Sequence, residues 1–367
     1  MSNKEKAMAN RKLFAAMLAI VLGMTAAGCS KVKQAVEMLK GAKELQKEDG
    51  SGDTTGEDTD DETTAGETGD GSWIAVKDST FGTTRISAIA YGKDMFVAAG
   101  QEGKMATSAD GITWTAVEDS TFDTSYIGAI TFGNDRFVAI GGGGQMAVST
   151  DGTNWTAVSD NPFEFLIQAI AFGNGRFIAA GDYNKMAVSR NGTNWTEVDV
   201  SEIFSFNDSI NAIAFGNNRF VAVGTGGKMA ASRNGTNWTE VDVSMIFGRG
   251  TEVSISAITH GNNRFFAAGA EDLGAPTQTA TSTDGTNWTE VDVSSVFGTG
   301  SINVIAWGNN MFVAIGGDKM ADSTDGTNWT AVEDSTFGAS EIHAIVYADG
   351  KFVAGGAEGK MAYSTGK

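Results

Sequence analysis

The stretch STDGTNWT occupies residues 149–156 and returns unchanged at 282–289 and 323–330. Close variants stand at 108–115 (SADGITWT), 189–196 and 232–239 (both SRNGTNWT). Together with Trp73, the tryptophans of these copies are spaced by 41, 41, 40, 43, 50 and 41 residues. A period of this length is the signature of a repeat architecture in which each unit is one small sheet.

Each repeat contains four short apolar runs separated by turn residues. In the second repeat they are 127–132 (IGAITF), 136–140 (RFVAI), 145–149 (QMAVS) and 155–158 (WTAV). Gly and Asn between the runs tolerate positive φ and favour tight hairpins. The sequence therefore predicts an all-β fold, a seven-bladed β-propeller with four-stranded antiparallel blades over residues 73–367.

The ends of the repeat array predict how the ring closes. Residues 73–76 (WIAV) match the fourth strand of a repeat, and the array stops after KMAYS, which matches a third strand. We expect strand 73–76 to complete the last blade, because an open ring would expose unpaired strand edges. An open solenoid would instead need special caps at both ends.

Several apolar residues recur once per repeat and are expected in the core. The alanines of the first strand suit crowding near the axis, and the methionines suit inter-blade filling without a role as metal ligands. These residues are Phe81, Phe122, Phe163, Phe204, Phe247, Phe297 and Phe337; Ala88, Ala90, Ala129, Ala169, Ala171, Ala212 and Ala214; and Met105, Met146, Met186, Met229, Met320 and Met361.

The repeated turn has a local explanation. Its Asp can accept backbone N–H bonds, its Gly supplies an unusual backbone angle, and its Trp fills space between blades. This S-x-D-G-x-x-W pattern resembles the Asp-box (BNR) repeat of sialidases and other propellers, including lipoproteins. We interpret the motif as structural, and its residues are Asp110, Trp114, Asp151, Trp155, Asn191, Trp195, Asn234, Trp238, Asp284, Trp288, Asp325 and Trp329.

The resemblance to sialidases implies three converging arginines, a Tyr–Glu pair and an acidic catalyst. The candidate arginines do not form such a set, because Arg136, Arg176, Arg219 and Arg264 occupy the same position of successive repeats. Nucleophile-elbow, zincin and P-loop motifs are missing from the sequence. We therefore expect no enzyme, no catalytic residues and no cofactor, with a glycoside hydrolase as the alternative. His260, His343 and one cysteine cannot build a zinc site, and we expect no bound metal.

The N-terminal region predicts export and lipid anchoring. Residues 1–28 combine basic residues with a short apolar run and end before Cys29, as in a lipoprotein signal peptide. Residues 26–29 (AAGC) resemble the bacterial lipobox, which implies that Cys29 is acylated and anchors the protein to the membrane of the bacterial cell envelope, on the periplasmic side or at the surface. An ordinary cleaved signal with a chance cysteine is the alternative.

Two segments separate this cysteine from the propeller. Residues 29–47 are predicted to form a basic helix that either lies on anionic headgroups or merely begins the tether. Residues 48–72 hold ten acidic and no basic residues, and no apolar residue larger than alanine, which predicts a disordered linker. The whole chain has a net charge of −19, which disfavours nucleic acid as a partner.

Recognition is expected on the face whose loops vary. The first and third connections of each repeat are nearly uniform, whereas the second and fourth differ in length and chemistry, as in 122–127, 163–167, 204–210, 247–255 and 270–279. Variable loops on a rigid scaffold commonly carry binding. The candidate partner-binding residues are Tyr126, Phe165, Phe206, Arg249, Glu252, Arg85, Glu271 and Asp272, although Phe165 and Phe206 are also consistent with packing beneath their own loops.

These observations leave three hypotheses. The favoured one is a lipid-anchored, non-catalytic monomer that binds a protein or glycan through the variable face. The second is an assembly or scaffold factor for an envelope complex, and the third is a glycosidase. A carboxylate pair facing one pocket at the channel mouth would favour the third.

Overall fold

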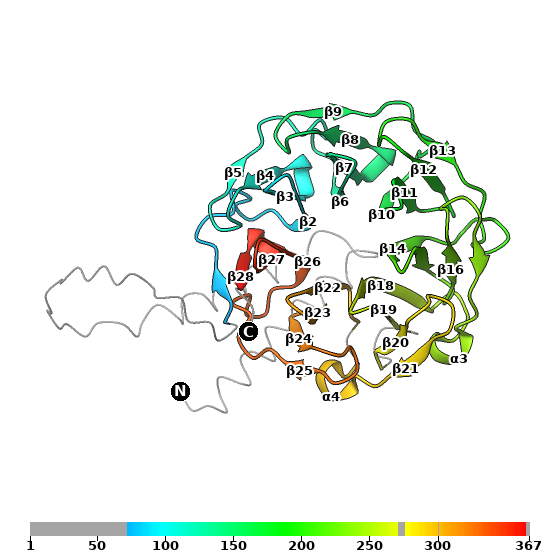
Figure 1. Cartoon of the computed structure of the whole chain (residues 1–367). Helices are drawn as coiled ribbons and strands as arrows, with labels where there is room; N and C mark the ends of the chain where they lie inside the picture. Colours follow the sequence, from blue (N-terminus) through cyan, green and yellow to red (C-terminus); the bar gives the residue numbers. More distant parts are fainter. Residues whose placement is uncertain (1–71, 271–275, 300, 365–367) are drawn as a thin grey trace, which may run out of the picture. The chain divides into compact units, whose positions relative to one another are not determined.

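The computed structural model describes residues 72–270, 276–299 and 301–364, which all fall within the compact unit Glu67–Lys367. Its strands form seven four-stranded sheets arranged around a central axis, so the predicted seven-bladed propeller is confirmed (Figure 1). The segments predicted at 1–28, 29–47 and most of 48–72, together with Cys29, Glu271 and Asp272, lie outside the described residues.

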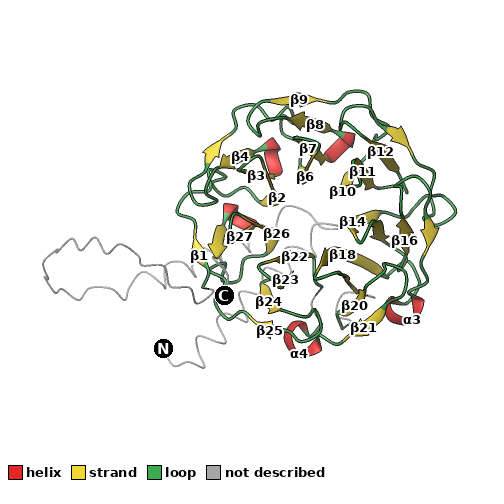
Figure 2. Cartoon of the chain, viewed as in Figure 1, coloured by secondary structure: helices red, strands yellow, loops and turns green. Residues whose placement is uncertain are grey.

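In each of the first six blades the strands follow one another from the axis outward (Figure 2). The bounds of the strands in blades 1 to 3 are β2 (Ile86–Gly92), β3 (Met95–Gly100), β4 (Met105–Ser108), β5 (Thr115–Ala116); β6 (Ile127–Gly133), β7 (Arg136–Gly141), β8 (Met146–Ser149), β9 (Trp155–Ala157); β10 (Ile167–Gly173), β11 (Arg176–Gly181), β12 (Met186–Ser189) and β13 (Thr196–Glu197). In blades 4 to 6 they are β14 (Ile210–Gly216), β15 (Arg219–Gly224), β16 (Met229–Ser232), β17 (Thr239–Glu240); β18 (Ser254–Gly261), β19 (Arg264–Ala270), β20 (Gln278–Ser282), β21 (Thr289–Val291); β22 (Val304–Gly308), β23 (Met311–Gly316), β24 (Lys319–Ser323) and β25 (Thr330–Ala331).

The seventh blade closes the ring with strands from both ends of the described chain. Its strands are β26 (Ile342–Ala348), β27 (Lys351–Gly356), β28 (Met361–Ser364) and β1 (Ile74–Ala75). β1 pairs with β28, with Ile74 opposite Tyr363, and the backbone N–H of Val76 donates to the carbonyl of Met361 at 2.8 Å. The predicted closure is therefore confirmed.

Short helices occur only in connections between the described strands. They are η1 (Gln101–Gly103), η2 (Gly142–Gly144), η3 (Ala357–Gly359), α3 (Ser244–Phe247) and α4 (Ser294–Phe297). The three η segments connect the second and third strands of their blades, and the two α segments lie between blades at the outer rim (Figure 1).

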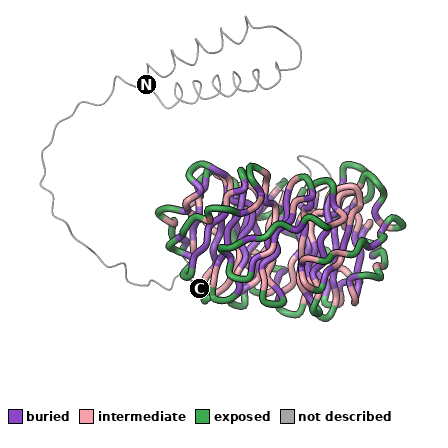
Figure 3. Tube along the Cα trace, turned by 90° about the horizontal axis from the view of Figure 1, so that it is seen from above, coloured by how far each residue is buried: buried purple, intermediate pink, exposed green. Residues whose placement is uncertain are grey.

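The core lies between neighbouring blades and within the second strands. β7 and β11 are buried along nearly their whole length, whereas β10 alternates between buried and partly exposed residues. The second strand has sheets on both faces, while the first strand turns one row of side chains toward the axis, which accounts for this difference. All seven repeated phenylalanines and all six repeated methionines that were expected in the core are buried. Figure 3 shows the buried strands between two exposed layers of loops.

In six of the seven blades, a glycine at or next to the end of the second strand lies opposite the residue at which the first strand bulges. In blade 2 the register of β6 shifts between Ile127 and Ala129, and Gly141 lies opposite Ile127. A Cβ atom at Gly141 would come within 1.9 Å of the carbonyl oxygen of Tyr126. This close backbone approach fixes where the loop before the first strand enters the sheet.

Candidate functional site

The propeller has two faces, and hydrogen bonds identify the loops of each. One face, which we call the turn face, carries the turns between the first and second strands and the repeated turns between the third and fourth. There the side-chain amide of Asn134 donates to the carbonyl oxygens of Gly175, at 3.4 Å, and of Arg190, at 2.7 Å, in the next blade. The other, which we call the loop face, carries the remaining connections, and there the N–H of Gly103 donates to the carbonyl of Ser125 at 2.8 Å. The uniform turns and the variable loops are thus segregated as expected.

The repeated turn of the turn face is held by its Asp side chain. Asp151 Oδ1 accepts the backbone N–H groups of Thr153 at 2.9 Å and Asn154 at 2.8 Å, and its Oδ2 accepts the side-chain amide of Asn154 at 2.8 Å. Gly152 has a φ of +79°, in the left-handed region. Hydrogen bonds from Asn154 hold the pKa of Asp151 well below its usual range.

The two Asn copies keep the same turn without the charge. Asn191 Oδ1 accepts the backbone N–H groups of Thr193 at 3.1 Å and Asn194 at 2.9 Å, and Asn234 is bonded in the same way. An amide carries only one acceptor oxygen, so it has no second oxygen with which to hold the Asn side chain three residues later. The carboxylate is therefore not needed for the turn itself.

The tryptophans of the turns pack against the second strands. Trp155 lies 6.4 Å from Phe137 between ring centroids, and its Nε1 donates to the carbonyl of Gly152 at 2.9 Å. Trp114, Trp195 and Trp238 make the same bond, whereas the Nε1 atoms of Trp288 and Trp329 have no partner among the described residues. The turn is a packing unit in each of these blades.

The loop face carries an exposed aromatic cluster. Phe165 and Phe206 are 48% and 68% exposed, and Tyr183 lies between them, with ring-centroid distances of 4.4 Å to Phe165 and 5.2 Å to Phe206. Phe165 and Phe206 come from the loops that precede and follow blade 3, and Tyr183 from the connection between β11 and β12. We call these three residues the aromatic cluster. Tyr183 is not among the residues predicted from the sequence, although it is an aromatic residue in a connection that reads GQEGK, GGGGQ or GTGGK in other blades.

A pocket of about 370 Å³ lies on the same face. Its lining includes Arg85, Tyr126, Leu166 and Gln168. The guanidinium of Arg85 lies 5.5 Å from the ring centroid of Tyr126 and donates to its hydroxyl at 3.4 Å, while Arg85 Nε is buried without a partner among the described residues. Leu166 follows Phe165 directly, so the pocket adjoins the aromatic cluster.

Hydrogen bonds between polar side chains hold the loops around this pocket in place. Asp182, next to Tyr183, accepts hydrogen bonds from Gln168 Nε2 at 2.6 Å and from Ser209 Oγ at 2.8 Å, which ties blade 3 to the loop before blade 4. Burial and the nearby charge of Arg85 lower the pKa of His343, against the opposing effect of Glu341. The bonds of Asp182 thus hold the connection that carries Tyr183 against β10 and the loop before blade 4.

The other candidate residues of the loop face are not brought into this group. Arg249 pairs with Glu240 at 3.3 Å and with Asp242 at 3.1 Å, and the Glu252 carboxylate accepts a bond from Thr251. No contact joins Arg249 or Glu252 to the aromatic cluster within the described part of the chain. Arg85 and Tyr126 therefore belong to the pocket beside the cluster, and Arg249 to a separate ion-pair group.

The repeat-equivalent arginines at the start of the second strands point toward the turn of the following blade. Arg176 Nη1 donates to the carbonyl of Asn234 at 2.8 Å, and Arg264 Nη1 to that of Asp325 at 3.1 Å. They contact successive turns around the ring and do not surround one substrate.

Across residues 72–270, 276–299 and 301–364, no group of three His, Cys, Asp or Glu side chains is placed to hold a metal ion, and no helix is long and apolar enough to span a membrane.

Comparison with protein families finds one match. Residues 54–172 and 248–367 match the family described as the DUF6242 beta propeller domain. A search of curated proteins finds no match. The family match covers more than half of the chain and fits the propeller described above.

Solved structures share the fold at low sequence identity. YCF48 from Cyanidioschyzon merolae is 19% identical with a TM-score of 0.60, covering 80% of this chain and 98% of that one. YCF48 bound to D1 peptide is 17% identical with a TM-score of 0.60, covering 81% and 96%. A catalytically inactive virginiamycin B lyase from Staphylococcus aureus, solved with quinupristin, is 12% identical with a TM-score of 0.63, covering 80% and 98%. These likenesses concern the fold.

Proposed function

Because this chain belongs to the DUF6242 beta propeller family, we propose that it acts as a non-catalytic scaffold that binds a protein partner through its loop face. The observation that carries this proposal is the aromatic cluster of Phe165, Tyr183 and Phe206. Exposing large aromatic rings to water is unfavourable, and such residues supply much of the binding energy of protein interfaces.

The pocket beside the cluster supports the same proposal. Arg85 and Tyr126 provide a cation and a hydroxyl next to an apolar surface, which suits a peptide backbone or an acidic side chain. The described lining of this pocket contains no Asp or Glu, and a glycosidase would need two carboxylates there. YCF48, which shares the fold, has been solved with a bound peptide, and a partner-binding or assembly role for this chain is consistent with it.

Loss of the aromatic cluster should abolish partner binding without unfolding the protein. We expect the combined substitution Phe165→Ala, Tyr183→Ala and Phe206→Ala to weaken binding at least about a hundredfold, since each buried anchor contributes about 1–2 kcal/mol. The exposed positions of Phe165 and Phe206 predict little change in melting temperature. The measurement is a quantitative pull-down with the full-length tagged protein, in which captured proteins are compared between wild type and variant.

Ile112 provides the matched control, because it is an apolar residue 38% exposed on the opposite, turn face. Ile112→Ala should leave the captured proteins unchanged. If Ile112→Ala removed the partner while the triple variant retained it, the functional face would be the turn face and the proposal would be wrong.

We propose further that the repeated turn is an Asp-box with a structural role. We also propose that the propeller is tethered to the membrane of the bacterial cell envelope through a lipid on Cys29. The support is the sequence of residues 1–29, which ends in the AAGC stretch. Cys29→Ala should move the protein from the detergent phase to the aqueous phase in a partitioning assay with non-ionic detergent. Ser30→Ala is the control, and unchanged partitioning of the Cys29 variant would exclude acylation at that site.

A further inference from the structure

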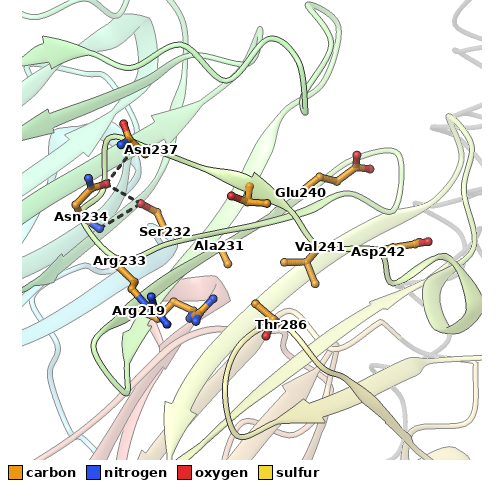
Figure 4. Close-up of a pocket in the computed structure, with 11 residues that line it drawn as sticks. Arg219, Ala231, Ser232, Arg233, Asn234, Asn237, Glu240, Val241, Asp242 and Thr286 are labelled. Carbon is orange, nitrogen blue, oxygen red and sulfur yellow. Dashed lines mark hydrogen bonds between the residues drawn. The ribbon is translucent and has the colours of Figure 1, made fainter.

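Two equivalent grooves lie beside the repeated turns of blades 3 and 4, on the turn face and apart from the proposed partner site. The larger, of about 570 Å³, is lined by Arg219, Arg233, Asn237 and Thr239 among others (Figure 4). The smaller, of about 350 Å³, is lined by the residues 43 positions earlier in the chain, Arg176, Arg190, Asn194 and Thr196. One donor set thus occurs twice on neighbouring blades.

Two changes coincide in these two repeats, beside an arginine that blades 2 and 5 also have. Arg190 and Arg233 stand where the other copies have Ala109, Thr150, Thr283 and Thr324, and each is followed by Asn in place of Asp. The second strands of the same blades begin with arginine, at 176 and 219. Blades 3 and 4 therefore combine two arginines with a neutral turn, whereas the other described turns have at most one arginine beside a carboxylate.

The replacement of the turn Asp by Asn191 and Asn234 also leaves a side-chain amide donor available in each groove. In blades 2, 5 and 6 the side-chain amides of Asn154, Asn287 and Asn328 donate to the second carboxylate oxygen of the turn Asp, at 2.8, 2.7 and 2.8 Å. The amides of Asn194 and Asn237 have no such acceptor and make no side-chain hydrogen bond with the described residues. Each groove therefore presents an amide donor beside its two guanidinium groups.

The arginine charges are not neutralised by protein carboxylates. Arg190, Arg219 and Arg233 make no ion pair within the described residues, and Arg176 uses one N–H on a backbone carbonyl. The acids at the far end of the larger groove, Glu240 and Asp242, are held by Arg249. Figure 4 shows Arg219 and Arg233 close together, away from these two acids. The basic end of the groove is available to an external anion in a chain whose net charge is −19.

We infer that the two grooves bind oxyanion groups of an acidic polysaccharide, one anionic sugar in each groove. A guanidinium group can donate two parallel hydrogen bonds to the two oxygens of a carboxylate or to two of the oxygens of a sulfate group. The amide and the Thr hydroxyl suit sugar hydroxyls. A ligand with a repeating unit fits two copies of one site on adjacent blades, whereas an acidic peptide has no such period. The two sites act together through effective concentration, so a long ligand binds more tightly than a single sugar.

The test measures binding of fluorescent oligogalacturonate and of a heparin oligosaccharide to the full-length protein at about 0.15 M salt, where long-range repulsion is screened. The variant Arg190→Thr with Arg233→Thr restores a residue used at this position in three other turns, so it preserves the fold. It should weaken binding of at least one of the two probes by about tenfold or more, since charge-assisted bonds are lost from both grooves. The neutral glycan dextran should not bind wild type.

The reverse experiment introduces the groove residues into another blade. Thr150→Arg with Asp151→Asn in blade 2, where Arg136 is already present, creates a third groove and should tighten binding of the longer probes severalfold. A charge-matched control, Lys77→Thr with Thr83→Asp, changes the net charge as much as the arginine variant but alters exposed residues elsewhere, and binding should stay within about twofold of wild type.

The opposite results would overturn the assignment. Equal weakening by the arginine variant and the charge-matched control would mean that only net charge matters. Tighter binding of polyglutamate than of either polysaccharide would assign the grooves to an acidic peptide, and absence of binding by all probes would leave no anion site. None of these results depends on the aromatic cluster, whose test uses the other face.

Discussion

Deletion of residues 1–77 should lower the melting temperature strongly and cause aggregation, whereas deletion of residues 1–70 should leave stability unchanged. The longer deletion removes β1 and its pairing with β28, and exposes the edge of β28 to other chains. It also removes Trp73, which is 8% exposed and packs against Phe352 at 6.4 Å. Loss of a buried Trp side chain alone costs about 3–5 kcal/mol.

The measurement is thermal and urea unfolding of the two deletions side by side. Trp73→Ala in the full-length chain separates the two contributions, because it leaves the backbone pairing of β1 intact and should give an intermediate loss of stability. Equal melting temperatures for the two deletions would show that blade 7 is stable with three strands and would contradict closure by β1.

Gly141→Ala should destabilise blade 2 by about 2–3 kcal/mol or more, although it adds only one methyl group. Its Cβ would lie 1.9 Å from the carbonyl oxygen of Tyr126, a backbone atom that cannot rotate away. Overpacking of this kind forces backbone shifts, and here the shift would move the start of β6 and the loop that carries Tyr126. The measurement is the free energy of unfolding in urea.

The neighbouring residue provides a control of the same chemistry. A Cβ at Gly142 would meet its nearest atoms only at 3.8 and 3.9 Å, an ordinary contact, and the φ of this residue is not in the left-handed region. Gly142→Ala should therefore change stability by less than about 0.5 kcal/mol. If the two substitutions were equally mild, the close approach of Gly141 to the β6 backbone would not constrain the blade.

Most of the fold could be predicted because its information is local and repeated. The apolar runs 127–132 and 136–140 correspond to β6 and β7 within one residue at each boundary, since the Asn and Gly residues between them fix the turn. The sequence did not reveal the bulge at Ile127–Ala129 or the role of Gly141, because a strand-end glycine in the sequence does not show which backbone atom lies above it.

The candidate site was predicted less completely. Phe165 and Phe206 were identified from the variable loops, but their partner Tyr183 comes from a different class of loop, and only the fold places that loop between them. Arg249 was grouped with them because its loop departs from the repeat, whereas its guanidinium lies with Glu240 and Asp242. Sequence variation identified the face, but not which side chains of that face meet.

The sequence by itself determined the number of blades, the closing strand and the segregation of uniform turns from variable loops, because each follows from a period and from the alternation of strand direction. Only the tertiary structure decided that Tyr183 joins two loops into one aromatic surface. It also decided that Arg176, at the start of β11, and Arg190, in the turn after β12, line one groove. Periodicity specifies each residue's place within its blade. The contacts between side chains of different loops and strands depend on how the blades and their connections pack in three dimensions.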